Sequence, residues 1–392
     1  MKHGRRRNTG RQGTAMAMAA LLAAQAASPA WAGAREQARR IHDRIAGVPP
    51  SEAVLAQMAA DITGGNPQAA AQRALGNRNF YNVTLKNFVA PWTNRAQTVF
   101  VPLNDYTATV IGMVRDDVDF REVLHGDVLY ISNTAGAPAY SSSNNNHYAY
   151  LEDNDTDLQA TLTQTTQSSL TGLPATATAG VITTRAAAEA FFIAGTNRAM
   201  FRYTMLNHLC RDMDTMMDTT LPSDRIRQDV SRSPGGDSRI FLNSCIGCHT
   251  GMEPLTQAFA YYNFDATSGA LQFTPGQVQA KYLNNSDNFK PGYVTTSDHW
   301  DNYWRMGIHR QLGWSASLPG SGDGAKSMGW ELANSDAFAE CQVKKVFKAV
   351  CLREPGNAAD RAAVAAAAAG FRSGGYRLKQ VFADTAVYCM GD

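Results

Sequence analysis

The sequence of 392 residues lacks any long apolar run outside its amino terminus. A helix that crosses a bilayer needs roughly 20 consecutive apolar residues, so we expect no membrane span in the mature chain. Lys and Arg form no block after residue 32, which argues against a nucleic-acid-binding protein. The sequence also shows no phosphate-binding Gly loop, calcium loop or Ser-His-Asp arrangement. These absences exclude several common function classes.

The amino terminus has the three-part pattern of a secretory signal peptide. Five basic residues occur within the first 11 positions, and the 13 residues from Ala15 to Ala27 form an apolar core. Ala30-Trp31-Ala32 then places small residues at the positions that a signal peptidase inspects. The apolar core is too short to span a membrane. We therefore expect cleavage after Ala32 and a mature protein in the periplasm or at the outer cell surface.

Cleavage would change the charge of the chain. Removing the five basic residues of the signal from the 36 in the chain leaves 31 against 34 acidic residues, a formal charge of −3. The mature protein is therefore slightly acidic, and we expect no nucleic-acid partner.

The spacing of apolar residues predicts a mainly α, multi-helical fold. Ser51 is a candidate N-cap, and the residues after it keep the spacing of a buried helical face. Ser, Thr, Asn, Ala and Gly dominate residues 132–180, which we expect to form a long surface excursion with few core contacts. Turns containing Gly separate three helices expected near the carboxyl end, over residues 335–353, 358–371 and 376–389.

The segment Cys245-Ile246-Gly247-Cys248-His249 is the attachment sequence for haem c. On one helical turn, the two thiols can each bond one vinyl group of the haem, and the His249 imidazole can ligate the iron. Because the motif occurs once, we expect one covalent haem c, bound by Cys245, Cys248 and His249. The aromatic-rich residues 250–265 are expected to form a helix against the porphyrin edge.

The motif also organises the chain into regions. After the signal peptide at 1–32, we expect a helical amino-terminal region at 33–180, which includes the surface stretch at 132–180. A haem c-binding region with ordered loops is expected at 181–330, and a three-helix region at 331–392. A single c-type haem segment is thus flanked by helical regions and long loops.

Two other interpretations of the motif are less favoured. A thioredoxin-like redox pair requires a βαβ context, which the sequence does not indicate. A zinc site requires further ligands at short spacing, and the separation of Cys341 from Cys351 is a poor match. The adjacent His249 and the export signal both favour haem.

The residues around the motif resemble the planctomycete-type cytochrome c families of unknown function, which occur as joined modules in exported bacterial proteins. This resemblance implies a haem-bearing redox protein of the cell envelope and no particular substrate. Those families usually carry Asp where this chain has Glu253. The matching segments are Asp119–Leu124, Gly180–Thr184, Asn207–Cys210, Cys245–His249, Met252–Pro254, Tyr262–Asp265 and Leu332–Ser335 with Phe338, Ala339 and Cys341.

The four cysteines outside the motif predict two disulfides in an oxidising compartment. Cys341 and Cys351 lie ten residues apart on one expected helix, about 15 Å, which exceeds the Cα separation that a disulfide tolerates. In an up-down-up arrangement, the ends of the first and third carboxy-terminal helices meet. This favours pairing Cys351 with Cys389 and Cys210 with Cys341.

The sixth iron ligand must come from another segment, because Met252 shares the face of His249. We predict Met328, which lies in a Gly-flanked loop before a carboxy-terminal helix, with a core-filling role as its alternative. His299, Met306 and His309 are the other candidates.

The remaining histidines and the tryptophans have simpler interpretations. We expect His208 to be a hydrogen-bonded core residue and His42, His125 and His147 to be surface or capping residues. Trp300, Trp304 and Trp314 predict either a small aromatic core or a wall of the haem pocket.

Three functions are compatible with a chain so much longer than a minimal cytochrome. The first is electron transfer in the cell envelope with a redox partner protein that no residue pattern identifies. The second is a haem enzyme, of peroxidase or oxygenase type, with an open distal iron site. The third and weakest is a binding or assembly protein with a structural haem.

Overall fold

The structure is a computed structural model that describes residues 1, 32–193, 195–226, 238–283 and 293–391. Apart from Met1 and Ala32, the predicted signal peptide lies outside these ranges. The described residues are mainly helical and include three small antiparallel sheets of two strands each. The prediction of a mainly α fold is therefore confirmed. None of the described helices has both the length and the apolar character that crossing a bilayer requires.

In the described residues, the first half of the chain, before the CxxCH motif, consists mostly of short helices and has two strands. They are α2 (Ala34–Ala46), α3 (Glu52–Thr63), α4 (Pro67–Leu75), η1 (Phe80–Leu85), α5 (Lys86–Val89), η2 (Ala90–Thr93), α6 (Asp105–Arg115), α7 (Glu122–His125), β1 (Leu129–Ser132), α8 (Asn146–Asp153), α9 (Leu158–Thr161), β2 (Leu162–Thr165), α10 (Gln167–Thr171), η3 (Gly180–Thr183), α11 (Arg185–Phe191), α12 (Arg198–Thr204), η4 (Met205–Leu209) and η5 (Met213–Thr215).

The second half carries the motif and the carboxy-terminal helices. Its elements are α14 (Ser238–Ile240), η6 (Phe241–Cys245), α15 (Ile246–Thr256), η7 (Gln257–Phe259), β3 (Tyr262–Asp265), β4 (Ala270–Phe273), η8 (Ala280–Tyr282), β5 (His299–Asp301), η9 (Tyr303–Arg305), η10 (Gly307–Leu312), β6 (Ser321–Asp323), α17 (Gly324–Ala333), α18 (Asp336–Cys351), α19 (Ala358–Ser373) and α20 (Leu378–Tyr388).

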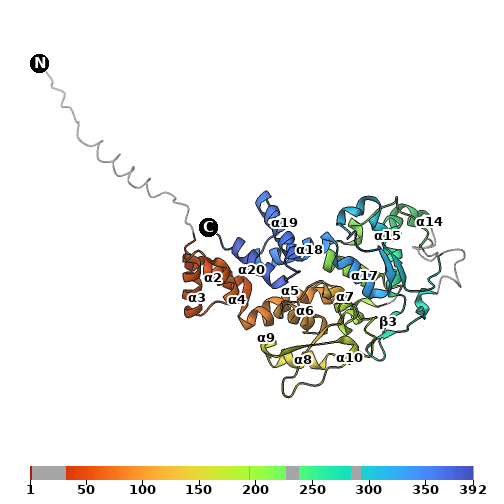
Figure 1. The fold of residues 1–392 in the computed structure, drawn as a ribbon, viewed down its shortest axis with the longest axis horizontal. Coiled ribbons are helices and arrows are strands. Elements are labelled where there is room, and N and C mark those ends of the chain that lie inside the picture. Colours follow the sequence, from red (N-terminus) through yellow and green to blue (C-terminus); the bar gives the residue numbers. More distant parts are fainter. Residues whose placement is uncertain (2–31, 194, 227–237, 284–292, 392) are drawn as a thin grey trace.

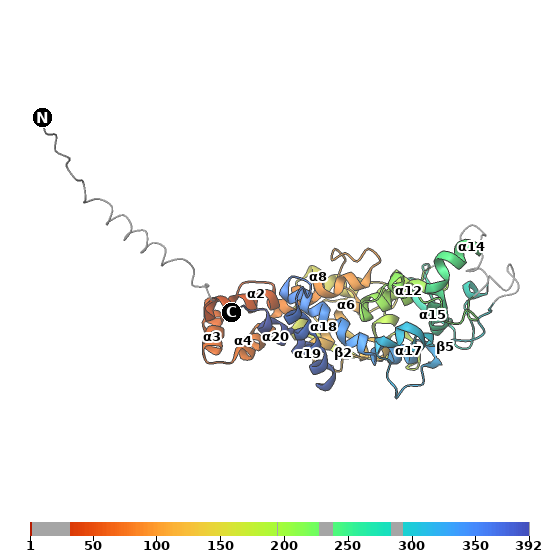
Figure 2. The ribbon, with the colours of Figure 1, turned by 90° about the horizontal axis from the view of Figure 1, so that it is seen from above.

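The molecule is elongated, and α15 lies at the end opposite to α2, α3 and α4 in both views (Figures 1 and 2). The carboxy-terminal helix α20 returns to that amino-terminal group, where Arg40 and Arg44 donate to the carbonyls of Met390 and Cys389. These arginines satisfy carbonyl groups at the end of α20 that lack helical partners.

Several local predictions are confirmed. Ser51 caps α3, because its Oγ accepts a hydrogen bond from the amide of Val54 at 3.3 Å. The three carboxy-terminal helices α18, α19 and α20 form where the sequence predicts them and pack on one another.

The Ser/Thr/Asn-rich stretch differs from the prediction of few core contacts. Its residues form α8, α9, β2 and α10, and β2 pairs antiparallel with β1. Tyr148 and Leu151 are 1% exposed, and the Tyr148 hydroxyl donates to the carbonyl of Tyr130 at 2.7 Å. A few apolar side chains, spaced between polar ones, are therefore enough to attach this stretch to the core.

Other local expectations were wrong at element boundaries. The spacing of Phe120, Val123 and Leu124 predicts a short helix over 119–130, but only residues 122–125 are helical, because β1 begins at Leu129. Likewise, the expected helix over 250–265 ends at Phe259, and β3 follows. In both places a strand with β-branched or aromatic residues follows, Tyr130 and Ile131 in β1 and Tyr262 and Phe264 in β3, and it pairs with another strand.

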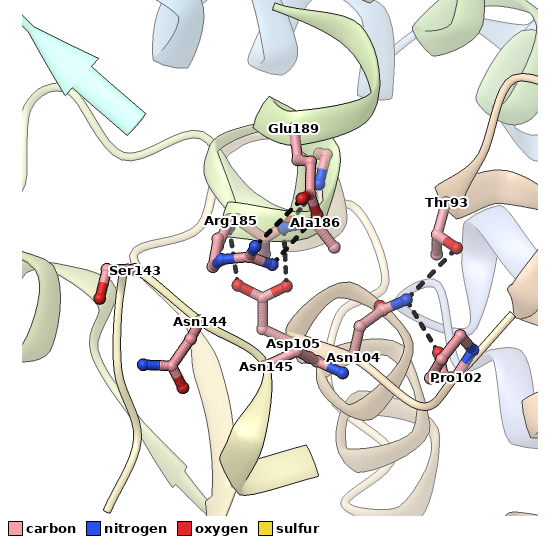
Figure 3. A network of polar contacts seen from close by, with 12 residues as sticks. Thr93, Pro102, Asn104, Asp105, Ser143, Asn144, Asn145, Arg185, Ala186 and Glu189 are labelled. Atoms are coloured by element: carbon pink, nitrogen blue, oxygen red, sulfur yellow. Dashed lines mark hydrogen bonds and ion pairs between the residues drawn. The ribbon is translucent and has the colours of Figure 1, made fainter. Parts of the chain in front are cut away.

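Asp105, at the start of α6, joins this half of the fold to α11. Its buried carboxylate accepts hydrogen bonds from the amides of Arg185 and Ala186 at 2.7 and 3.0 Å (Figure 3). These are amides of the first turn of α11, which have no helical acceptor. Arg185 pairs with Glu189 on the next turn of the same helix (Figure 3). The contact positions α11, and α12 follows it toward the motif.

Candidate functional site

The CxxCH motif lies where the helical segments α14, η6 and α15 follow one another without a break. Cys245 is the last residue of η6, and Cys248 and His249 lie in the first turn of α15. Cys245, Cys248 and His249 are therefore brought together on one helical turn.

The cysteine pairing separates the motif from the other four cysteines. Cys210 pairs with Cys341, with a Cα separation of 5.3 Å, and Cys351 pairs with Cys389 at 5.5 Å. Both predicted pairings are confirmed. Cys245 and Cys248 remain free thiols, as attachment of a haem requires.

The surroundings of Cys248 do not match those of a redox-active thiol. Burial raises the pKa of the Cys248 thiol, and the nearby Cys245, Asp214 and Asp212 add to the increase. A catalytic CxxC pair instead has a thiol of lowered pKa. The sheets of the described residues are antiparallel pairs without a βαβ unit. Within the described residues, no three or more His, Cys, Asp or Glu side chains lie close enough together to hold a metal ion.

A cavity of about 500 Å³ opens beside the motif. Its volume lies within the range of about 300–1,000 Å³ that is usual for ligand and cofactor sites. Besides Cys248 and His249, its walls consist of Arg198, Ala199, Arg202, Asp212, Met213, Asp214, Met217, Ser244 and Met252. The walls thus combine thioether side chains with two arginines and two aspartates. A larger cavity, of about 780 Å³, lies at α2 and does not include motif residues.

The segment from Met213 to Asp218 packs against the first turn of α15. The Met213 carbonyl accepts a hydrogen bond from the Cys248 thiol at 3.1 Å, and the Asp218 amide donates to the carbonyl of Gly247 at 2.9 Å. The Thr250 hydroxyl donates to the Asp218 carbonyl at 2.8 Å. These contacts hold one wall of the cavity, including Met217, against the motif.

His249 is oriented by Glu253, which lies one turn further along α15. The Nδ1 atom of His249 donates to Oε1 of Glu253 at 2.7 Å, and the Nε atom of Arg198 donates to the same oxygen at 2.6 Å. Glu253 is fully buried, and the ring of Phe241 packs against the His249 ring at 5.5 Å. No hydrogen bond to Nε2 of His249 is formed by any described residue. His249 therefore has one ring nitrogen held by a carboxylate and the other available to a ligand.

The predicted sixth ligand, Met328, lies elsewhere. It is fully buried in α17, so its surroundings form a helix and not the expected loop. The expectation of a loop around Met328 was wrong, because Ala325, Leu332 and Ala333 give this glycine-containing segment an apolar helical face. Met328 does not line the cavity beside the motif. Its role as an iron ligand stays a prediction.

The other candidates for that role do not line the cavity either. His299 is paired with Asp323 at 3.0 Å, Met306 is 47% exposed, and His309 is buried beside Trp304. Of the predicted site residues, the structure thus brings only the three motif residues together.

Two of the three histidines that were expected at surface or capping positions are buried. His42 is 1% exposed and contacts the carbonyl of Val48, and His147 is 2% exposed and contacts the carbonyl of Pro138. The surface alternative was therefore wrong for both, and His125 is half-buried. The Nε2 atom of His208 bonds the Tyr106 hydroxyl at 2.8 Å, and its buried Nδ1 has no partner among the described residues.

The donor set at the motif fits a c-type haem. Two free thiols on one turn can form the covalent links, and His249 presents a ring nitrogen without a partner in the described ranges. The thioether side chains that line the cavity suit a porphyrin, and its arginines suit propionate groups.

No family model, curated protein or solved structure matches the chain. The resemblance of the motif region to the planctomycete-type cytochrome c families stays a prediction drawn from the residues.

Sequence reasoning missed three residues of this site. Glu253 could have been found, because a residue four positions after His249 faces it on a helix. Arg198 and Met217 carry no such signal, since they lie 51 and 32 positions before His249. Only folding brings them to the motif.

Proposed function

We propose that this chain is an exported c-type cytochrome with one covalent haem that transfers electrons in the cell envelope. The observation that carries the proposal is the arrangement around His249. Its Nδ1 atom is held by Glu253, and the ring lines a cavity together with the free thiol Cys248. This orientation leaves Nε2 available as an iron ligand, and metal-bound histidines in proteins are typically held in this way.

The residues of the site have distinct tasks in this proposal. Cys245 and Cys248 tether the haem, and His249 ligates its iron from the same helical turn. Arg198 and Arg202 line the cavity and can pair with carboxylate groups of the bound cofactor. When bound, the haem supplies an iron atom that alternates between the ferrous and ferric states. The Met213–Asp218 segment forms one wall of the cavity and is held to the motif by its hydrogen bonds with Cys248 and Thr250.

Covalent attachment is the direct test. The full chain is produced in a bacterial host with a cytochrome c attachment system and isolated from the envelope fraction. We expect one haem per chain by mass, and this haem should stay with the polypeptide in acid and acetone. Extraction of free haem, or a mass with two haems, would contradict the proposal.

A matched pair of variants makes this test specific. C245S/C248S removes both thiols of the motif and should abolish covalent haem. C351A/C389A removes a disulfide from the opposite part of the chain and should keep the haem. Equal haem content in both variants would show that attachment does not use the motif.

Export forms part of the proposal. Two disulfides in the described residues support an oxidising compartment. We expect the intact mass of envelope protein to correspond to a chain that begins at Gly33. A cytoplasmic protein that retains Met1 would contradict this.

A haem enzyme is the second candidate, and one observation favours it. None of the distal ligands predicted from the sequence lines the cavity beside His249, as an iron with an open distal side requires. Electron carriers usually hold the iron with two protein ligands, whereas enzymes leave one side open. An absorption spectrum with and without cyanide separates the two: an unchanged spectrum supports electron transfer, and an immediate shift supports the enzyme.

A further inference from the structure

The strongest unassigned feature of the molecule is a buried chain of three side chains behind the motif. Glu253 is fully buried, and a single oxygen of its carboxylate accepts hydrogen bonds from both His249 and Arg198. These two donors belong to two helices, His249 to α15 and Arg198 to α12. A buried carboxylate is costly unless it is paired, so a pair at this place constrains His249.

The chemistry of the contact determines the state of the imidazole. Oε1 of Glu253 takes the hydrogen bonds of both His249 and Arg198, and an ionised carboxylate can only accept. Nδ1 of His249 is therefore the donor in this contact, which leaves Nε2 as the ring nitrogen that can ligate iron. His249 and Glu253 are four residues apart on α15, so the helix itself places their side chains next to each other.

We propose that Glu253 is a positioning residue that makes His249 a strong electron donor and lowers the reduction potential of the iron that His249 ligates. The inference rests on the proposed function. A carboxylate on Nδ1 increases the basicity of the ring as a metal ligand, which favours ferric over ferrous iron. Arg198 counters part of the negative charge and so limits the effect. The Glu253 and Arg198 side chains thus adjust the potential in opposite directions.

The chain offers a matched control for this pair. Arg305 donates to Glu331 through the same atoms, Nε and Oε1, at 2.7 Å, and Glu331 is 1% exposed. Oε1 of Glu331 also accepts a hydrogen bond from the side-chain amide of Asn302, and no described histidine donates to Glu331. A change at Glu331 therefore reports the general cost of losing a buried Arg–Glu pair.

The test is a redox titration of the haem-loaded full chain and its variants. E253Q keeps the size of the side chain and removes its charge. At a fixed potential we expect the ferrous-to-ferric ratio to increase at least tenfold, which equals a positive shift of about 59 mV for one electron. R198Q should shift the potential in the negative direction, and E331Q should leave it unchanged. Equal shifts in E253Q and E331Q, or no shift in E253Q, would overturn the proposal.

A second readout separates this inference from the proposed function. Nitrogen NMR of the purified, histidine-labelled full chain in the haem-free C245S/C248S background reports which ring nitrogen of His249 carries the proton, because iron bound to Nε2 would fix the proton on Nδ1 whatever residue 253 is. We expect Nδ1 in the wild type and a mixed or reversed assignment in E253Q. If the chain carries no covalent haem, the proposed function fails, yet this measurement still tests the positioning role. A reversed assignment in the wild type would overturn it.

Discussion

A Cβ atom at position 251 would lie 1.9 Å from Nε1 of Trp304, so the indole occupies the space that any larger side chain at Gly251 would need. Trp304 is fully buried and packs against Phe201 at 5.7 Å and His309 at 6.0 Å. Trp304 therefore lies directly against α15 at Gly251, which is two residues after His249. The tryptophan cluster supports the helix that carries the motif, and it does not line the cavity.

The first prediction follows from this contact. G251A should destabilise the protein by about 1–3 kcal/mol, because overpacking a core displaces side chains and backbone. Urea unfolding measures this change. G370A is the matched control, since Gly370 lies in α19 with no atom within 4 Å of the added Cβ. It should stabilise the protein by about 0.5–1 kcal/mol through helix propensity. Equal effects of both variants would show that the indole moves freely.

The second prediction concerns the sixth iron ligand. Met213, Met217 and Met252 line the cavity, and of these only Met217 is exposed, at 45%. Met328 is buried in α17. We expect M217A to lose the low-spin ferric spectrum and the near-infrared band of a sulfur–iron bond. M328A should keep both. The opposite result would restore the assignment made from sequence, and a high-spin wild type would favour the enzyme.

The third prediction concerns the disulfides. Peptide mapping without reduction should link Cys210 to Cys341 and Cys351 to Cys389. Replacing either pair by alanine should lower the free energy of unfolding by about 2–5 kcal/mol. The loss should be larger for Cys210–Cys341, because its partners are 131 residues apart and those of the other pair are 38 apart. A link between Cys341 and Cys351 would contradict the continuous helix α18.

The fourth prediction is a pH dependence that arises from His125. Burial lowers the pKa of His125 to about 4, and Lys326 and Arg121 lower it further, whereas Asp119 opposes them. No residue in the described ranges forms a hydrogen bond with its buried Nε2, and its ring centroid lies 4.3 Å from that of Trp330. The unfolded chain, with a histidine pKa near 6.5, therefore binds this proton first as the pH falls.

Above pH 6.5, His125 does not reduce the free energy of unfolding. As the pH falls from 6.5 to about 4, its protonation in the unfolded chain lowers that free energy by about 3 kcal/mol in total. H125F keeps the ring contact with Trp330 and should remove this part of the pH dependence. Burial also lowers the pKa of His208, which contributes in the same direction. The difference between the wild-type and H125F curves isolates His125, and parallel curves would contradict the prediction.

Local sequence patterns predicted much of the fold. The cap at Ser51, the three carboxy-terminal helices and the turn that presents Cys245, Cys248 and His249 all depend on residues within a few positions of one another. The disulfide pairing was also predictable, because the length of α18 separates Cys341 from Cys351. Neighbouring residues share a helix, and its geometry determines their relation.

Tertiary structure alone decided the rest of the site. Arg198 reaches Glu253 from α12, and the Met213–Asp218 segment packs on α15 although it lies some 30 residues earlier in the chain. The same holds for Trp304 against Gly251 and for the buried residues of the Ser/Thr/Asn-rich stretch. No periodicity encodes these contacts, because they result from the packing of whole elements whose side chains fill a common core.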